Sequence, residues 1–371
     1  FGCGQVHYLC LHGVTPWVGS GKGLEGSLAW VVAVGFESCH LIDCGWPRTA
    51  VIIAGKKTNC RIAFQEFNLQ GAILPTDYDW YENLSAQDGL SEVNFWRPSD
   101  RRGFRAREGS PFLFKLKAPH NAICGFGYFK QYNPLPIWLA WDAFERANGC
   151  ESLQELVDRI VKLRPDPIID GSAIRIGCIQ IVDPIFFARE EWIRQPADWP
   201  PNIQSDKRYD LTVGEGLRVW LECLDRVRST SGLVAEPRSR YGGATLITPR
   251  LGQGSFRVAV SEAYDWGCAV TAEHSLPALD AAHIKAFDEE GPNHVNNGLL
   301  LRADVHRLFD RGYVTVSPEL ELEVSGRLRE DFSNGRSYYP FHGQKIHIPR
   351  RLELRPAAEF LEWHNNNRYL G

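Results

Sequence analysis

The chain has 371 residues, 44% of them hydrophobic, and a formal net charge of −4 at pH 7. A chain of this length usually divides into more than one domain, each with its own hydrophobic core, and the apolar content is ordinary for globular proteins. We therefore expect two domains. The negative charge excludes the overall basic surface common among DNA-binding proteins, so that cations for such a role must be local. No stretch reaches the roughly 18 unbroken apolar residues of a membrane span.

The ten cysteines are scattered and contain no CxxC pair. This spacing excludes a small secreted disulfide scaffold and a paired-cysteine zinc knuckle. We therefore expect a reduced, cytoplasmic setting.

Residues 1–70 form the first segment in chain order. They begin without Met, and the whole sequence contains none. Two interpretations stay open: an open reading frame translated from upstream of a true start, which makes this segment non-native, or a protein in which Met is rare. We assign no function to this segment.

Residues 71–215 alternate short strand patterns with helical ones. Apolar runs predict strands, and longer amphipathic runs predict helices. The expected strands are residues 111–116, 122–128 and 174–181, and the expected helices are residues 137–148 and 153–163. We therefore expect an α+β or barrel-like mixed module.

This second segment resembles the PUA-like domains that precede nuclease domains in predicted restriction endonucleases. The motifs that carry the resemblance are NFWRPS, FLFKL, IGCIQI and WPPNI. The superfamily includes readers of modified or flipped bases, which implies that this part recognises a base. A flipped base is held by aromatic stacking and by hydrogen bonds to its edge. We expect Trp96 and Trp80 to supply rings and Asn94 to supply an edge contact.

The densest cluster of cations lies next to these aromatic residues. It consists of Arg97, Arg101 and Arg102, with Arg105 and Arg107 close behind. Cations that contact phosphates position DNA without reading its sequence. We expect the first three to bind DNA, against the alternative of a solvated surface.

Residues 216–249 begin with an amphipathic helical pattern at 217–227 and then become rich in Ser, Gly, Pro and Arg. We interpret this segment as a helix and a flexible linker. A tethered nuclease would cleave at a variable distance from the recognised base.

Residues 250–371 carry the strongest pattern. A strand at 278–284 is followed by a loop rich in Gly, Pro and Asn, a returning strand at 298–301 and a helix from about residue 302 to Gly312. A hairpin at residues 313–325 and a last helix at 357–364 follow.

The polar residues of this pattern suit phosphodiester hydrolysis. His306 and Asp310 are four residues apart, so they share one helix face, where an imidazole and a carboxylate can hold a divalent cation. His283, at the end of the first strand, has the side chain best suited to act as a base near neutral pH. Asn297 either holds its own loop or steadies that imidazole.

The segment with AAHI, NGLLL and HRLFDRG resembles the HNH endonucleases, whose fold is the ββα-metal unit. The resemblance implies that His283 is the general base, that Asn297 supports the loop, and that His306 binds the metal with Asp310 as a further ligand. Members commonly place Asp or His where this chain has Ala282. Asp280 either substitutes for it, or the metal takes fewer protein ligands and more water.

Residues 250–264 resemble the lead-in strand of this family, which predicts a strand. Arg250 and Arg257 in it are expected phosphate contacts.

We therefore expect a PUA-like mixed module followed by a ββα-metal domain, acting as a metal-dependent DNA endonuclease. The expected cofactor is Mg²⁺ or Mn²⁺, with Zn²⁺ as an alternative. The expected substrate is DNA that carries modified bases. A restriction-type defence enzyme fits this description. Two alternatives remain: a nicking or repair nuclease that ignores modification, and a nucleic-acid reader that has lost catalysis, marked by Ala282. Double-strand cleavage by one such site per chain suggests a homodimer or two successive nicks.

Overall fold

The computed structural model describes residues 48–53, 61–66, 69–164, 174–201, 205–230, 252–286 and 289–371. The chain divides into two compact units, Phe1–Gly71 with Pro196–Pro200 and Arg208–Leu246, and Ala72–Gln195 with Pro201–Lys207 and Ile247–Gly371. Most of residues 1–70, and Arg250, fall outside the described residues. Within the described part of the chain, no helix has the length and apolar character needed to cross a membrane.

The first unit contains the antiparallel pair β1 (Arg48–Ile53) and β2 (Arg61–Glu66) and the helix α4 (Gly214–Thr230). Helix α4 covers the amphipathic segment predicted at residues 217–227, and Val219 and Cys223 on it are fully buried. The predicted linker beyond α4 lies outside the described residues.

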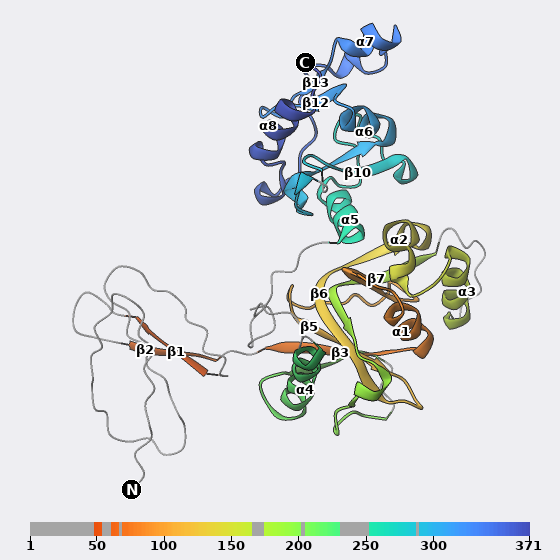
Figure 1. Ribbon diagram of the computed structural model, residues 1–371, viewed down its shortest axis with the longest axis vertical. Helices are drawn as coiled ribbons and strands as arrows, with labels where there is room; N and C mark the ends of the chain where they lie inside the picture. The colour runs from red at the N-terminus through yellow and green to blue at the C-terminus, as the bar shows by residue number, and fades with distance from the viewer. Residues whose placement is uncertain are drawn as a thin grey trace. The chain divides into compact units, whose positions relative to one another are not determined.

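The second unit contains a twisted sheet in the order β4-β7-β6-β5-β3 (Figure 1). Strands β3 and β5 are parallel, the remaining neighbours are antiparallel, and β8 pairs with β6. The strands are β3 (Gln70–Thr76), β4 (Glu92–Arg97), β5 (Pro111–Leu116), β6 (Ala122–Pro136), β7 (Arg175–Phe186) and β8 (Ile193–Arg194), and β9 (Lys207–Asp210) follows in sequence. All six residues of β5 are buried, which explains why all of them except Lys115 are apolar.

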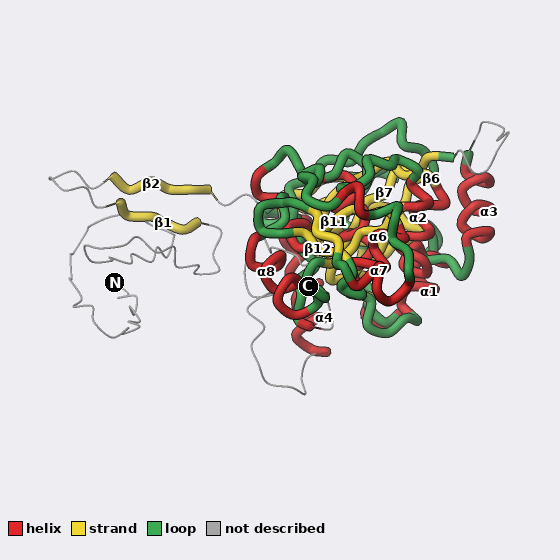
Figure 2. The backbone as a smooth tube through the Cα atoms, turned by 90° about the horizontal axis from the view of Figure 1, so that it is seen from above, coloured by secondary structure: helices red, strands yellow, loops and turns green. Residues whose placement is uncertain are grey.

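Three helices accompany this sheet, one between β3 and β4 and two between β6 and β7 in sequence. They are α1 (Tyr78–Ser85), α2 (Ile137–Phe144), which continues into the 3-10 turn Glu145–Asn148, and α3 (Leu153–Leu163). Figure 2 shows α1, α2 and α3 in red beside the yellow strands. Helix α3 is capped by Ser152, whose hydroxyl accepts from the amide of Glu155, while the Glu155 carboxylate accepts from the amide of Glu151, the residue before the cap. The predicted strands and the helices α2 and α3 are confirmed, and α1 was missed.

The C-terminal part of the same unit contains the predicted ββα arrangement. Strand β10 (Leu279–His283) pairs antiparallel with β11 (Gly298–Arg302), and helix α6 (Ala303–Asp310) follows at once. The hairpin of β12 (Val314–Val316) and β13 (Leu322–Val324) comes next, followed by α7 (Arg327–Phe332) and α8 (Ala358–Asn367). A shared apolar core holds these elements together. The expectation of a mixed fold with a ββα unit is confirmed.

One predicted element was wrong: in the range 250–264, the described residues do not form a strand. Residues Gln253–Ala263 form the helix α5. Phe256, Val260 and Tyr264 recur every four residues and are at most 1% exposed, so they make one buried helical stripe. The carboxylate of Glu92, which is distant in sequence, accepts hydrogen bonds from the first turn of this helix. A short apolar run does not distinguish a strand from a buried helix, and the partner that favours the helix lies far away in sequence.

Candidate functional site

The candidate site lies on the β10–β11 hairpin and helix α6. His283, at the end of β10, is directly opposite Gly298, the first residue of β11. Asn297 is fully buried and binds the loop that joins the strands: its side-chain oxygen accepts from the amide of Lys285, and its amide group donates to the carbonyls of Lys285 and Pro292. Of its two expected roles, Asn297 therefore has the first, holding its own loop.

The imidazole of His283 is steadied by two residues that sequence reasoning missed. Its Nε2–H donates to Oδ1 of Asn293 at 2.7 Å, and the ring of Phe256 stacks on it with centroids 4.0 Å apart and planes 10° apart. Since Nε2 carries the proton, Nδ1 of the neutral ring is an acceptor. Burial lowers the pKa of His283, the Asn293 hydrogen bond opposes this effect, and nearby His306 adds to it. These contacts hold the neutral ring of His283 with Nδ1 as its acceptor.

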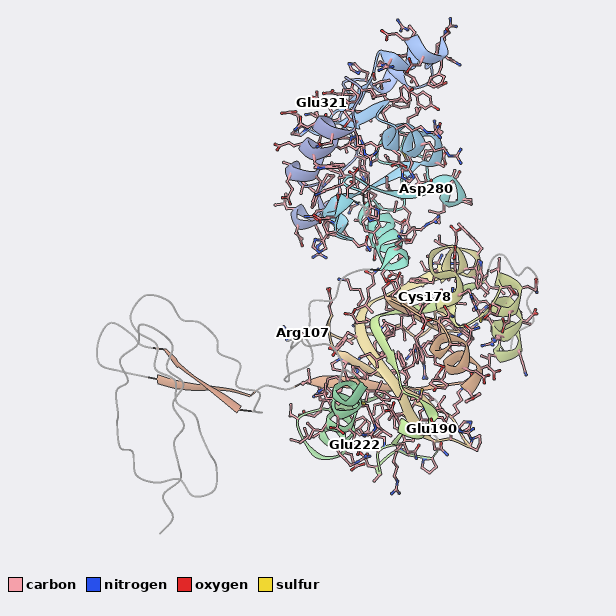
Figure 3. All side chains as sticks on the ribbon, in the orientation of Figure 1. Arg107, Cys178, Glu190, Glu222, Asp280 and Glu321 are labelled. Atoms are coloured by element: carbon pink, nitrogen blue, oxygen red, sulfur yellow. The ribbon has the colours of Figure 1, made fainter. Side chains whose placement is uncertain are left out.

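Two carboxylates flank His306 on α6. Its Nδ1 lies 3.3 Å from Oδ2 of Asp280, and its Nε2 lies 3.3 Å from Oδ2 of Asp310. Asp280, labelled in Figure 3, comes from β10. The side chain of Ala282 is instead fully buried in the apolar core. The residue immediately before His283 is thus part of the core here, and Asp280, three residues before His283, brings a carboxylate to His306.

These three side chains fit a divalent cation by their chemistry. One imidazole and two carboxylates are the nitrogen and oxygen donors that such cations accept in proteins. Within the described residues no group of three or more His, Cys, Asp or Glu side chains converges on one point, because the two carboxylates contact opposite nitrogens of His306. Binding a cation would therefore replace one of these carboxylate contacts.

A further group, which was not predicted, fixes the start of α6. Arg302 binds Asp304 through two hydrogen bonds of 2.6 and 2.8 Å, and the Tyr338 hydroxyl donates to the same carboxylate at 3.0 Å. Arg302 is the main cause that lowers the pKa of Asp304, to about 2. The helix that carries His306 is anchored by these contacts at its first turn.

The residues expected to contact a base are distributed between the interior and the surface of the sheet. Trp80 is 4% exposed, and its ring lies 5.2 Å from those of Phe95 and Phe114. Trp96 is half-buried and donates its Nε1–H to the carbonyl of Asn148 at 2.9 Å.

Asn94 is fully buried, and its amide donates to Oδ1 of Asn148 and to Sγ of Cys178. Among the described residues, its Oδ1 has no hydrogen-bond partner.

The arginines expected to contact phosphates differ in their exposure and in their partners. Arg97 pairs with Asp206 at 2.8 Å, and Arg257 pairs with Asp142 at 2.6 Å, so both hold parts of this unit together. The side chains of Arg101 and Arg102 are exposed. Of the four described arginines that were expected to contact phosphates, only Arg101 and Arg102 are therefore exposed.

A chain of buried amides, absent from the sequence predictions, crosses the sheet toward α5. Gln131 donates to Gln180, Gln180 donates to Asn133, and Asn133 donates to Glu262 on α5, at 2.8, 3.0 and 2.8 Å. The sequence could not predict this chain of hydrogen bonds, because the bonded partners are 47 to 129 residues apart.

Comparisons with known proteins agree with the C-terminal assignment. Residues 268–317 match the HNH endonuclease family. No curated protein sequence matches the chain.

Among solved structures, an ASCH protein from Zymomonas mobilis is 12% identical, with a TM-score of 0.28, over 41% of this chain and 93% of that one. A modification-dependent restriction endonuclease, TagI, is 11% identical, with a TM-score of 0.25, over 80% of this chain and 82% of that one. Both likenesses are distant.

Proposed function

We propose that this chain is a metal-dependent DNA endonuclease that hydrolyses phosphodiester bonds with His283 as the general base. The observation that carries the proposal is the state of His283, whose ring is held by Asn293 and Phe256 with Nδ1 as an acceptor. Asp280 on β10, the strand that ends at His283, lies 3.3 Å from His306, so we place the base and the donor set in one site. The family match over residues 268–317 supports a nuclease.

The chemistry assigned to the chain follows from these positions. Nδ1 of His283 takes a proton from a water molecule, and the resulting hydroxide oxygen forms a bond to phosphorus. The bond from phosphorus to the leaving sugar oxygen breaks, its electron pair stays on that oxygen, and the oxygen takes a proton from solvent. Asn297 keeps the loop beside His283 closed throughout.

His306, Asp280 and Asp310 are the residues that would hold the cation. When bound, Mg²⁺ or Mn²⁺, with Zn²⁺ as the alternative, supplies Lewis-acid stabilisation of the charge on the phosphate and the leaving oxygen. The contact of Asp280 with His306 supports an active enzyme over a reader that has lost catalysis, because a carboxylate is present although position 282 is Ala.

The sheet is the part that we propose binds the DNA and selects a modified base. Exposed Arg101 and Arg102 are the proposed phosphate contacts. Half-buried Trp96 offers a ring, while Trp80 is buried against Phe95 and Phe114. The buried, unpartnered Oδ1 of Asn94 is an acceptor that an amino group on a base edge would satisfy. A restriction role in defence and a homodimer for double-strand cleavage are parts of the same proposal.

The experiment compares matched plasmids that are unmodified, cytosine-methylated or hydroxymethylated, each with Mg²⁺ or Mn²⁺. We expect wild type to cut modified plasmid preferentially, His283→Ala to cut at least about 10²-fold more slowly, and Trp96→Ala to lose the preference while it still cuts. Equal cutting of every plasmid by wild type contradicts base selection and leaves a nicking or repair nuclease. A folded wild-type chain that binds DNA but cuts with neither ion contradicts the endonuclease.

A further inference from the structure

Helix α5 lies between the sheet and the proposed base. Its Phe256 stacks on His283, while Val258, two residues later, is buried in the apolar cluster that contains Leu139 of α2 and Ile176 of β7. One short helix therefore contacts both His283 and the sheet.

The N-terminus of α5 is held by a buried carboxylate. Oε1 of Glu92 accepts from the amide of Gly254 at 2.7 Å, and Oε2 accepts from the amide of Ser255 at 3.0 Å. Glu92 is 7% exposed, and its burial raises its pKa, which these amide hydrogen bonds oppose. The first backbone amides of a helix have no acceptor within the helix. A carboxylate that accepts from two of them therefore fixes both the position and the direction of the helix start.

Two glycines allow this close approach. A Cβ on Gly252 would lie 2.2 Å from the Glu92 carboxyl carbon, and one on Gly254 would lie 2.3 Å from the carbonyl oxygen of Ala143. On the other side, a Cβ on Gly298, opposite His283, would lie 2.9 Å from Cζ of Phe256. Glycine is thus present at the points where α5 meets its neighbours on both sides.

We propose, on the basis of the proposed function, that Phe256 and Glu92 are positioning residues for the base: Glu92 sets the position of α5, and Phe256 on α5 sets the ring plane of His283. Glu92 lies on β4, two residues before Asn94 and four before Trp96. The strand proposed to read the base therefore also sets the geometry of the group proposed to take the proton. A base held even slightly out of line loses rate because it no longer faces its proton.

The first test reads the His283 ring directly and needs no activity. The full chain is labelled with ¹³C-histidine, and the His283 signal is assigned by its loss in His283→Gln. We expect an upfield-shifted ring signal in wild type that moves downfield in Phe256→Leu and shifts again in Glu92→Gln. Val316→Ala, in the same core, and Asp206→Asn, the acid paired with Arg97 on β4, are the matched controls and should leave it in place.

A His283 signal unchanged in either Phe256→Leu or Glu92→Gln overturns the inference. If Glu92→Gln does not fold, Glu92→Asp keeps the charge on a shorter side chain and is expected to move the signal in the same way.

The second test is cleavage. We expect Phe256→Leu and Glu92→Gln to lower kcat by about tenfold or more with KM unchanged, while Val316→Ala and Asp206→Asn stay near wild type. If Phe256→Leu and Glu92→Gln have the same kcat as the two control variants, the inference is overturned, while the proposed endonuclease activity is not. A wild-type chain that never cuts contradicts the endonuclease, and the ring signal still decides the positioning role.

Discussion

At the scale of single residues, the protonation of His283 controls the proposed reaction. Burial is the main cause of its lowered pKa, so the neutral ring persists at a pH where an ordinary imidazole is charged. We predict that the acid limb of kcat lies below about pH 6.5, the ordinary value for His. Single-turnover cleavage rates across pH measure it, and a rate already falling above that value would argue against His283 as the buried base.

A second histidine controls stability rather than chemistry. His364 is 2% exposed, donates Nε2–H to the Phe309 carbonyl, accepts from Thr315, and has a pKa lowered to about 4, mainly by burial. The unfolded chain takes up this proton near pH 6.5 and the folded chain only near pH 4, so stability is lost as pH falls between these values.

We predict a loss of up to about 3 kcal/mol from this group over that pH range. Urea unfolding of wild type and His364→Gln at pH 7.5 and 5 measures it. The decline should be smaller in the variant, and equal declines would contradict the assignment.

At the scale of elements, the hairpin, α6 and the sheet strands β5, β6 and β7 could be predicted because their signals are local, while β3 and β4 were not predicted. Apolar alternation, the Gly-Pro-Asn loop and the spacing of His306 and Asp310 all fall within short windows of sequence. Helix α5 could not be predicted, since Glu92 and Phe256 act through contacts 162 and 27 residues away. For the same reason, the sequence did not show that Asn293, rather than Asn297 in the same loop, contacts the imidazole of His283.

The contact between α5 and α2 gives a prediction for stability. Gly254→Ala puts a Cβ against the carbonyl oxygen of Ala143, so we expect a loss of about 2 kcal/mol or more in the free energy of unfolding. Gly326→Ala, at the start of α7, meets open space and should change it by less than about 0.5 kcal/mol. Urea unfolding curves compare the two, and similar losses would show that α5 does not pack closely on α2.

At the scale of the whole molecule, the sequence suggested a loosely tethered nuclease, but the contacts of α5 favour a different expectation. Glu92, Asp142 and Asn133 of the sheet part all bind α5. We therefore predict a narrow distribution of distances between the recognised base and the cut. Sequencing the ends of cleaved modified duplexes measures it, and a broad distribution would favour the flexible tether.

The measurement that tests the central claim most directly is the rate of plasmid cleavage by wild type, His283→Ala and His294→Ala under Mg²⁺ or Mn²⁺. His294 is an exposed histidine of the same loop and serves as the control. Because His283→Ala lacks the general base, we predict that its cleavage rate falls by at least about 10²-fold, while the rate of His294→Ala stays near that of wild type. Cleavage by a folded His283→Ala chain at the wild-type rate would contradict the account.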